Sequence, residues 1–283
     1  MAEEKKVKPK KHIVSNIALV IATAVFLYSA YQLVTIFMEY NKGEQEYKEI
    51  LDEVITEVPE TDNQDDSQNQ EPSQKPQTTP SEPVKRTEHK VLKVDFKKLK
   101  TINPDTVAWI SFDEPSKINY PVVRANDNDK YLKSTFEGKK NASGAIFMDA
   151  VNTGDFSNSN TFIYGHNMKN GSMFGQLRKY KNESFYREYP FFYIYMPDGR
   201  EVKYQIFAVG IVEDASESYR KYYMDDADYL KYLQYIQSIS RYKTGVEVTA
   251  ESEIVSLSTC TNVTETQRLL VHGVKISEKM VGE

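Results

Sequence analysis

The sequence of 283 residues has a single cysteine, Cys260, and only four histidines. A lone thiol excludes an internal disulfide, so the folded part must be stabilised by its apolar core alone. No cysteine–histidine group has the spacing of a zinc site, and no glycine-rich phosphate loop is present. The modest net charge of −5 argues against a nucleic-acid partner. These absences predict chemistry without a metal or a cofactor.

The N-terminal region has the opposite property, a long run without charge. Residues 13–38 contain no charged side chain and exceed the ~20 apolar residues that cross a bilayer as a helix. The positive-inside rule predicts that residues 1–12 are cytoplasmic and that the chain after residue 38 is extracellular. The flanking charges on which this rests are Lys5, Lys6, Lys8, Lys10 and Lys11 before the run and Glu39, Glu44 and Glu46 after it.

A cleaved signal peptide is the alternative for this run. Its apolar region would be shorter, and small residues would follow at a cleavage site. Here the run is long and ends in Ile-Phe-Met-Glu-Tyr at residues 36–40. We therefore expect an uncleaved signal anchor at 13–38, a single-pass helix in the cell membrane.

The segment 39–83 is predicted to be an extracellular stalk, largely disordered. Its first part holds Ile50, Leu51, Val54 and Ile55 among many charges, a pattern compatible with a short helix. Residues 58–83 are rich in Pro, Gln, Asp, Ser and Thr and contain almost no large apolar side chain, so they cannot bury enough surface to offset chain entropy. The folded domain is expected at 84–283.

That domain reads as mostly β-structure. Short runs rich in Val, Ile, Tyr and Phe alternate with Gly, Pro, Asn or Asp, a pattern typical of a closed or nearly closed barrel. A short helix is expected at 95–102 and a longer one at 225–240, where Tyr229, Leu233 and Ile236 recur on one face and Asp225 or Asp226 provides a cap. The expected strands are 107–112, 118–123, 145–148, 160–164, 191–195, 201–213, 247–249, 254–259 and 269–276.

Three residues are candidates for nucleophilic chemistry. Cys260 ends one strand-like run, Arg268 opens the next, and His166 ends an earlier run. A thiol with a cation on an adjacent strand suggests a nucleophile, and strand ends are where catalytic groups usually lie. His272 lies inside the last strand, where a structural role is expected.

Two further histidines are set aside. His12 lies on the cytoplasmic side of the run, where it cannot meet Cys260. His89 lies at the end of the stalk, with no apolar pattern to fix it.

Together these motifs resemble the sortases, exported cysteine transpeptidases of Gram-positive bacteria built on an eight-stranded β-barrel. The resemblance covers about 95–276 and is most like class B, including the N-terminal helix and the long helix before the catalytic strands. It implies that Cys260 is the nucleophile, His166 the proton-handling histidine and Arg268 the catalytic arginine. The motifs are NPDTVAWI at 103–110, INYPVV at 118–123, GAIFMD at 144–149, YGHN at 164–167 and LSTC at 257–260.

The resemblance also implies a substrate and an acceptor. The substrate is the C-terminal sorting signal of a surface protein, cut after its Thr through a thioester, and the acceptor is an amine of the peptidoglycan cross-bridge. Groove-lining positions carry over to Asn128, Leu132, Tyr219 and Ser258, and Thr261, directly after the cysteine, is a further candidate contact. No metal or other cofactor is implied.

Several alternatives remain open at this point. A pilin-polymerising sortase differs in its acceptor, although the Asp-Pro-aromatic lid of many such enzymes is not evident here. Another exported cysteine peptidase or an L,D-transpeptidase is an enzymatic rival, and a membrane-tethered β-domain adhesin is a rival without catalysis. The segment KPQTT at 75–79 resembles a sorting signal, which raises the hypothesis of a self-docking pseudosubstrate against chance in a low-complexity stretch.

Overall fold

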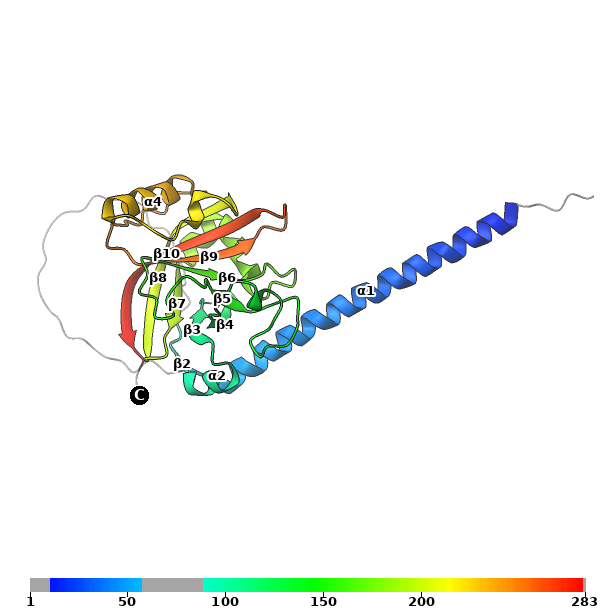
Figure 1. Ribbon diagram of the computed structural model, residues 1–283, viewed down its shortest axis with the longest axis horizontal. Helices are drawn as coiled ribbons and strands as arrows, with labels where there is room; N and C mark the ends of the chain where they lie inside the picture. Colours follow the sequence, from blue (N-terminus) through cyan, green and yellow to red (C-terminus); the bar gives the residue numbers. More distant parts are fainter. Residues whose placement is uncertain (1–10, 58–88, 114, 282–283) are drawn as a thin grey trace, which may run out of the picture.

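The centre of the molecule is a closed β-barrel. The computed structural model describes residues 11–57, 89–113 and 115–281. Around the barrel the strands follow the order β10-β8-β7-β3-β4-β5-β6-β9 (Figure 1), which confirms the predicted eight-stranded fold. The strands are β3 (Thr106–Ser111), β4 (Asn119–Val123), β5 (Ile146–Met148), β6 (Asn160–Tyr164), β7 (Phe191–Tyr195), β8 (Arg200–Glu213), β9 (Ile254–Cys260) and β10 (Gln267–Met280).

Large side chains fill the core on both faces of the barrel sheet. Trp109, Phe192 and Ile194 are fully buried in the main core. A second cluster forms on the outside, where α4 (Asp226–Ser238) covers Phe207 of β8 and Val274 of β10. Both faces of β9 are covered, so its residues are buried along nearly the whole strand, including the polar Ser256 and Ser258. The remaining elements are η1 (Lys130–Leu132), η2 (Phe174–Lys181), α3 (Glu183–Glu188) and η3 (Glu217–Tyr219).

Most expected elements lie within a few residues of their predicted bounds. Asp95 caps α2 (Phe96–Ile102), and Asp225 caps α4 through hydrogen bonds from backbone amides three residues on. The expected strand at 247–249 is wrong. Its residues alternate between half-buried and exposed, as strand residues do, but they pair with no barrel strand.

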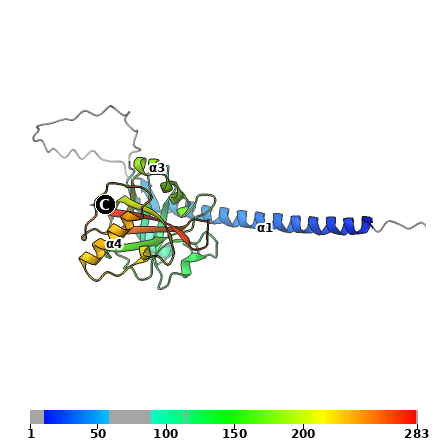
Figure 2. The same ribbon diagram turned by 90° about the horizontal axis from the view of Figure 1, so that it is seen from above.

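The N-terminal helix is longer than expected. α1 (Lys11–Val54) runs without interruption and projects away from the barrel (Figures 1 and 2). It is long and apolar enough to cross a membrane, and its most apolar window is not buried inside the structure. β1 (Ile55–Glu57) follows directly and pairs with β2 (Leu92–Val94) in a small separate sheet.

The predicted stalk therefore requires a correction for its first part. Tyr47, Ile50 and Val54 are buried against the barrel, so residues 39–57 belong to the folded unit. The many charges of this segment surround a narrow apolar stripe at i, i+3 and i+7, which is the spacing of a helix face. The rest of the predicted stalk, 58–83, and the segment 75–79 lie outside the described residues.

Candidate active site

Strand pairing brings the three candidates to one end of the barrel. Cys260, the last residue of β9, lies directly opposite Arg268 of β10 in the antiparallel register. β6 runs parallel to β9 on its other side, with Tyr164 opposite Ser258. His166 follows β6 by two residues, so its loop lies beside the end of β9 that carries the cysteine. Carboxyl ends of parallel strands meet at one edge, which makes this an edge where side chains from several elements converge.

The loop after β6 is hydrogen-bonded to the cysteine strand. The Asn167 side chain donates to the Cys260 carbonyl oxygen at 2.8 Å, and the Thr259 hydroxyl donates to the Gly165 carbonyl oxygen at 2.7 Å. Gly165 is in close contact with the core, because an added Cβ would lie 2.4 Å from Ile146 Cδ1. These contacts fix the backbone on both sides of the histidine.

The ring of His166 is oriented by a backbone carbonyl. Its Nε2 lies 2.7 Å from the Leu132 carbonyl oxygen. A carbonyl oxygen only accepts, so Nε2 must carry the hydrogen. Nδ1 is then the ring nitrogen that can gain or lose a proton without breaking this bond. His166 is half-buried, as is Cys260, whose thiol is free.

Arg268 is held by an acidic side chain and two carbonyls. Its Nη2 donates to Asp214 Oδ2 at 3.0 Å, and its Nη1 donates to the carbonyl oxygens of Glu265 at 2.6 Å and Gln267 at 3.2 Å. A guanidinium has five N–H donors. Within the described part of the chain, three are used in this way, which leaves one on Nη2 and the one on Nε for a ligand.

The predicted groove residues fall into two groups. The first contacts the catalytic strands: the Tyr219 hydroxyl lies 2.7 Å from Ser258 Oγ, and burial raises the pKa of Tyr219 to about 12 against the lowering effects of Ser258 and the Arg268 charge. Leu132, which is partly exposed, provides the carbonyl that binds His166. Tyr219 is therefore a neutral hydroxyl at the edge of the site.

Among the described residues, the side chains of the second group make no hydrogen bond to the three candidates. Asn128 is exposed, and its side chain accepts a hydrogen bond from the Ala150 amide at 2.8 Å. Thr261 is buried, and its backbone amide donates to the Gln267 carbonyl oxygen across the turn between β9 and β10. Asn128 shares with Leu132 the β4–β5 loop, which we define as residues 124–145, and that loop connects it to the site.

The other described histidines lie away from this edge. His272 is buried in β10, where its Nδ1 lies 2.8 Å from Ser256 Oγ, and burial lowers its pKa to about 3. His89 is fixed after all, between the carboxylates of Asp113 and Glu201 and stacked on Tyr193. Sequence patterns did not reveal this contact because its partners lie 24 and 112 residues away along the chain.

Two polar residues of the site were not among the predicted ones. Asn167 directly follows the candidate histidine, so the YGHN motif itself carried a signal for it. Asp214 directly follows β8, whose Val212 lies opposite Arg268. Its role depends on the register between strands that are more than fifty residues apart, which the sequence alone does not provide.

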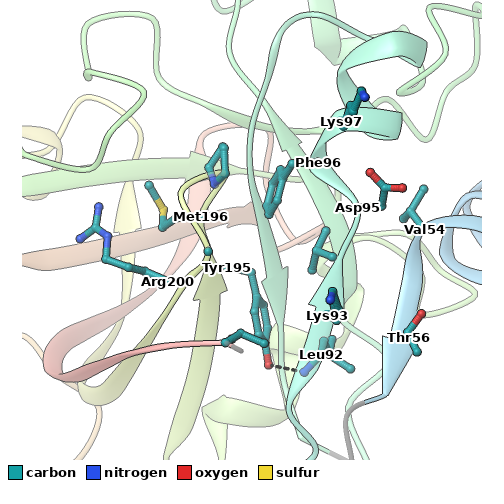
Figure 3. Close-up of a pocket in the computed structure, with 14 residues that line it drawn as sticks. Val54, Thr56, Leu92, Lys93, Asp95, Phe96, Lys97, Tyr195, Met196 and Arg200 are labelled. Carbon is teal, nitrogen blue, oxygen red and sulfur yellow. Dashed lines mark hydrogen bonds between the residues drawn. The ribbon is translucent and has the colours of Figure 1, made fainter. Parts of the chain in front are cut away.

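A pocket of about 600 Å³ lies elsewhere in the molecule. Figure 3 shows Val54 and Thr56 on one side of it and Met196 and Arg200 on the other, with the Tyr195 hydroxyl bonded to the Leu92 amide. Arg200 begins β8, whereas Val212, which lies opposite Arg268, is near the end of the same strand. At roughly 3.3 Å per residue, about 40 Å of strand separates the two. This pocket is a seam between the N-terminal elements and the barrel, distinct from the candidate site.

Comparison with known proteins links this geometry to one family. A family model described as a sortase domain matches residues 114–276. The chain is 36% identical over 168 residues to sortase B of Listeria monocytogenes, covering 59% of this chain and 67% of that protein.

Solved structures agree. Sortase B from B. anthracis in complex with AAEK1 superposes with a TM-score of 0.66 at 30% identity, covering 86% of this chain and all of that one. A Staphylococcus aureus sortase B–substrate complex gives a TM-score of 0.60 at 32% identity, covering 64% of this chain and 84% of that one.

Proposed function

Because this chain belongs to the sortase family of cysteine transpeptidases and is most like its class B, we propose that it cleaves the C-terminal sorting signal of surface proteins after a Thr. The acyl group that this cleavage forms is then transferred to an amine of the peptidoglycan cross-bridge. The observation that carries this proposal is the register that sets Cys260 opposite Arg268, with the His166 loop bonded to the same strand. The similarity to a S. aureus sortase B solved as a substrate complex supports a substrate site on this barrel.

In the proposed first step, the Cys260 sulfur attacks the carbonyl carbon of the Thr residue. The thiol proton passes to His166, the C–N bond breaks, a thioester forms, and His166 delivers that proton to the departing amine. The bond from Nε2 to Leu132 assigns that proton to Nδ1.

In the second step, an acceptor amine attacks the thioester carbon. The C–S bond breaks, a new amide forms, and the amine's proton returns through His166 to the thiolate. The two unused N–H donors of Arg268 are suited to the oxygen that becomes negative in both steps. The bonds to Asp214 and to two carbonyls already order this long side chain, so it loses less conformational entropy when the substrate binds.

A panel of quenched peptides of x-Pro-x-Thr-x form tests the reaction. The full chain in detergent micelles is incubated with each peptide, with and without triglycine, and the products are identified by mass spectrometry. We expect cleavage after Thr, ligation of triglycine, and no product from Cys260→Ala. Hydrolysis alone would favour a cysteine peptidase. No cleavage, together with a Cys260 that is inert to iodoacetamide in the folded protein, would favour a non-catalytic β-domain.

We further propose that α1 anchors the enzyme in the cell membrane, with residues 1–12 in the cytoplasm, 13–38 in the bilayer and the barrel outside. The single native cysteine provides the test. A membrane-impermeant maleimide should label Cys260 on intact cells. A Cys260→Ala chain carrying Lys6→Cys should be labelled only after permeabilisation, and the reverse pattern would overturn this topology.

A further inference from the structure

The part of α1 that follows the membrane run packs onto the loops beside the candidate histidine. Its most apolar window is not buried, whereas Tyr47 and Ile50 further along the helix are among the buried core residues. We call residues 39–54 the juxtamembrane helix. Figure 1 shows that it reaches the barrel next to the segments between β4 and β5. Through this contact, the helix lies against the same β4–β5 loop that binds the His166 ring.

Tyr47 is the central polar contact of the juxtamembrane helix. Its hydroxyl donates to the Gly144 carbonyl oxygen at 2.8 Å and accepts from the Phe136 amide at 3.1 Å, so one oxygen joins two points of the β4–β5 loop. Its ring packs edge-on against Tyr120, with centroids 5.3 Å apart. Burial raises the pKa of Tyr47 well above its usual value, so the hydroxyl stays neutral and can both donate and accept.

The same loop holds the ring of His166. Gly144 has φ +56, and an added Cβ would lie 2.9 Å from the Leu132 carbonyl oxygen and 3.1 Å from His166 Cδ2. The Leu132 oxygen is the acceptor for His166 Nε2. The Gly144 backbone thus lies between the Tyr47 hydroxyl and the imidazole of His166, and there is no room for a side chain at Gly144.

Further bonds fix the juxtamembrane helix on the same loops. The Glu39 carboxylate accepts from the Ala142 amide at 3.0 Å, and the Glu46 carboxylate accepts from the Glu137 amide at 3.2 Å. The Asn170 side chain, in the loop that carries His166, donates to Glu44 Oε2 at 3.2 Å. Both loops that flank the imidazole are therefore attached to one rigid helix.

We propose that Tyr47 is a positioning residue for the transpeptidation reaction: through the β4–β5 loop it fixes the Leu132 carbonyl and so the orientation of the His166 ring. The inference rests on the proposed function of His166. A misplacement of about 1 Å at a catalytic group is enough to cost up to ~100-fold in rate, even when it originates away from the chemistry. The juxtamembrane helix is then part of the catalytic unit as well as its tether.

The test compares two tyrosine variants of the full chain in detergent micelles. Tyr47→Phe removes the hydroxyl and keeps the ring. Tyr229→Phe is the matched control, because Tyr229 is also buried and its hydroxyl lies within 2.8 Å of two backbone carbonyl oxygens, of Ser159 and Ser252, which precede β6 and β9 at their amino ends. Each change removes one buried hydroxyl that bonds the backbone, but only the first touches the loop at His166.

We expect kcat of Tyr47→Phe to fall about 10-fold with KM within twofold, while Tyr229→Phe keeps both values. The pH titration of the His166 ring, followed by NMR, should shift in Tyr47→Phe and not in the control. If Tyr47→Phe does not fold, Glu46→Ala removes a neighbouring bond to the same loop, and a threefold loss of kcat is expected.

Two results separate failure of this inference from failure of the proposed function. Equal kcat and an equal His166 titration in wild type, Tyr47→Phe and Tyr229→Phe would overturn the positioning role and leave the transpeptidase intact. A wild-type chain that cleaves no peptide would overturn the proposed function. An unshifted His166 resonance in Tyr47→Phe would then also refute the structural link.

Discussion

At the residue scale, carbonyl oxygens decide how the polar side chains of the site present their nitrogen atoms. The Leu132 oxygen requires the hydrogen of His166 to be on Nε2. The carbonyls of Glu265 and Gln267 accept from Nη1 of Arg268, while Nη2 donates to Asp214. In both cases the side chain is oriented by the backbone, whose position is set by the barrel.

Arg268 gives a prediction at this scale. Arg268→Lys should lower kcat/KM by about 100-fold, because an ammonium group is a point charge that cannot reproduce the planar donors toward Asp214 and the substrate oxygen together. The measurement is steady-state turnover of a cleavable peptide. Arg200→Lys is the matched control, since Arg200 also pairs with carboxylates, of Asp198 and Glu278, at the other end of the barrel. Equal losses in both variants would contradict a catalytic role.

At the scale of elements, the position of His166 depends on the turn after β6 and on the side chains packed against that turn. The turn after β6 is pressed against Ile146 of β5 and Phe174 of η2 at Gly165. On the face of the sheet that α4 covers, hydrogen bonds link β10, β9, β6 and α4: Ser256 donates to Asn160, and Asn160 donates to Tyr232. The Ser256 hydroxyl has only one hydrogen, so the His272 Nδ1 must be the donor to it.

Gly165 provides the prediction for this scale. In Gly165→Ala the new Cβ would lie 2.4 Å from Ile146 Cδ1 and 2.8 Å from the Phe174 ring, so the turn that carries His166 must move. We expect kcat to fall by about 10- to 100-fold, and overpacking to cost roughly 1–3 kcal/mol of stability.

Gly210→Ala in β8 is the matched control for that experiment. Its Cβ would make only ordinary contacts, at 3.7 Å or more. Peptide turnover and the thermal midpoint of unfolding are measured for both variants. Full activity in a folded Gly165→Ala chain would show that the turn does not control the histidine.

At the scale of the whole molecule, the buried His272 and the half-buried His89 give the free energy of unfolding opposite dependences on pH. Burial lowers the pKa of His272 to about 3, so protonation favours the unfolded chain. Burial also opposes the charge of His89, but its hydrogen bonds to Asp113 and Glu201 outweigh this and raise its pKa. Three further groups face this cluster: the Tyr193 hydroxyl contacts Asp113, the Tyr195 hydroxyl contacts His89, and the Lys279 ammonium contacts Glu201. His89 joins the segment before β2 to the barrel.

The signs of the two contributions can be separated experimentally. For His272, stability is present above the unfolded pKa of about 6.5 and is lost as the pH falls toward 3, by up to ~1.4 kcal/mol per pH unit. For His89, stability is present below about 6.5 and is lost as the pH rises through the raised folded pKa.

The measurement is the thermal midpoint of unfolding between pH 5 and 8. His272→Gln should flatten the decline in stability toward pH 5, whereas His89→Gln should destabilise the protein more at pH 5.5 than at pH 8. Parallel pH profiles for wild type and both variants would contradict the assigned protonation states.

Sequence motifs and periodicity predicted the family resemblance, the approximate bounds of nearly every barrel strand, both capped helices α2 and α4, and the order of the cysteine, histidine and arginine motifs. These features depend on local periodicity, caps and short motifs, which a linear chain carries in full. The sequence also determined that residues 13–38 form an uncharged run long enough to span a bilayer.

The features that join distant segments are visible only in the folded molecule. The pairing of Cys260 with Arg268, the support of that arginine by Asp214, and the His89 contact with Glu201 each depend on strand register. The packing of residues 39–57 was missed because three buried apolar side chains are a small signal among many charges. Register and docking are set by the sum of many weak contacts across the fold, so no single stretch of sequence contains them.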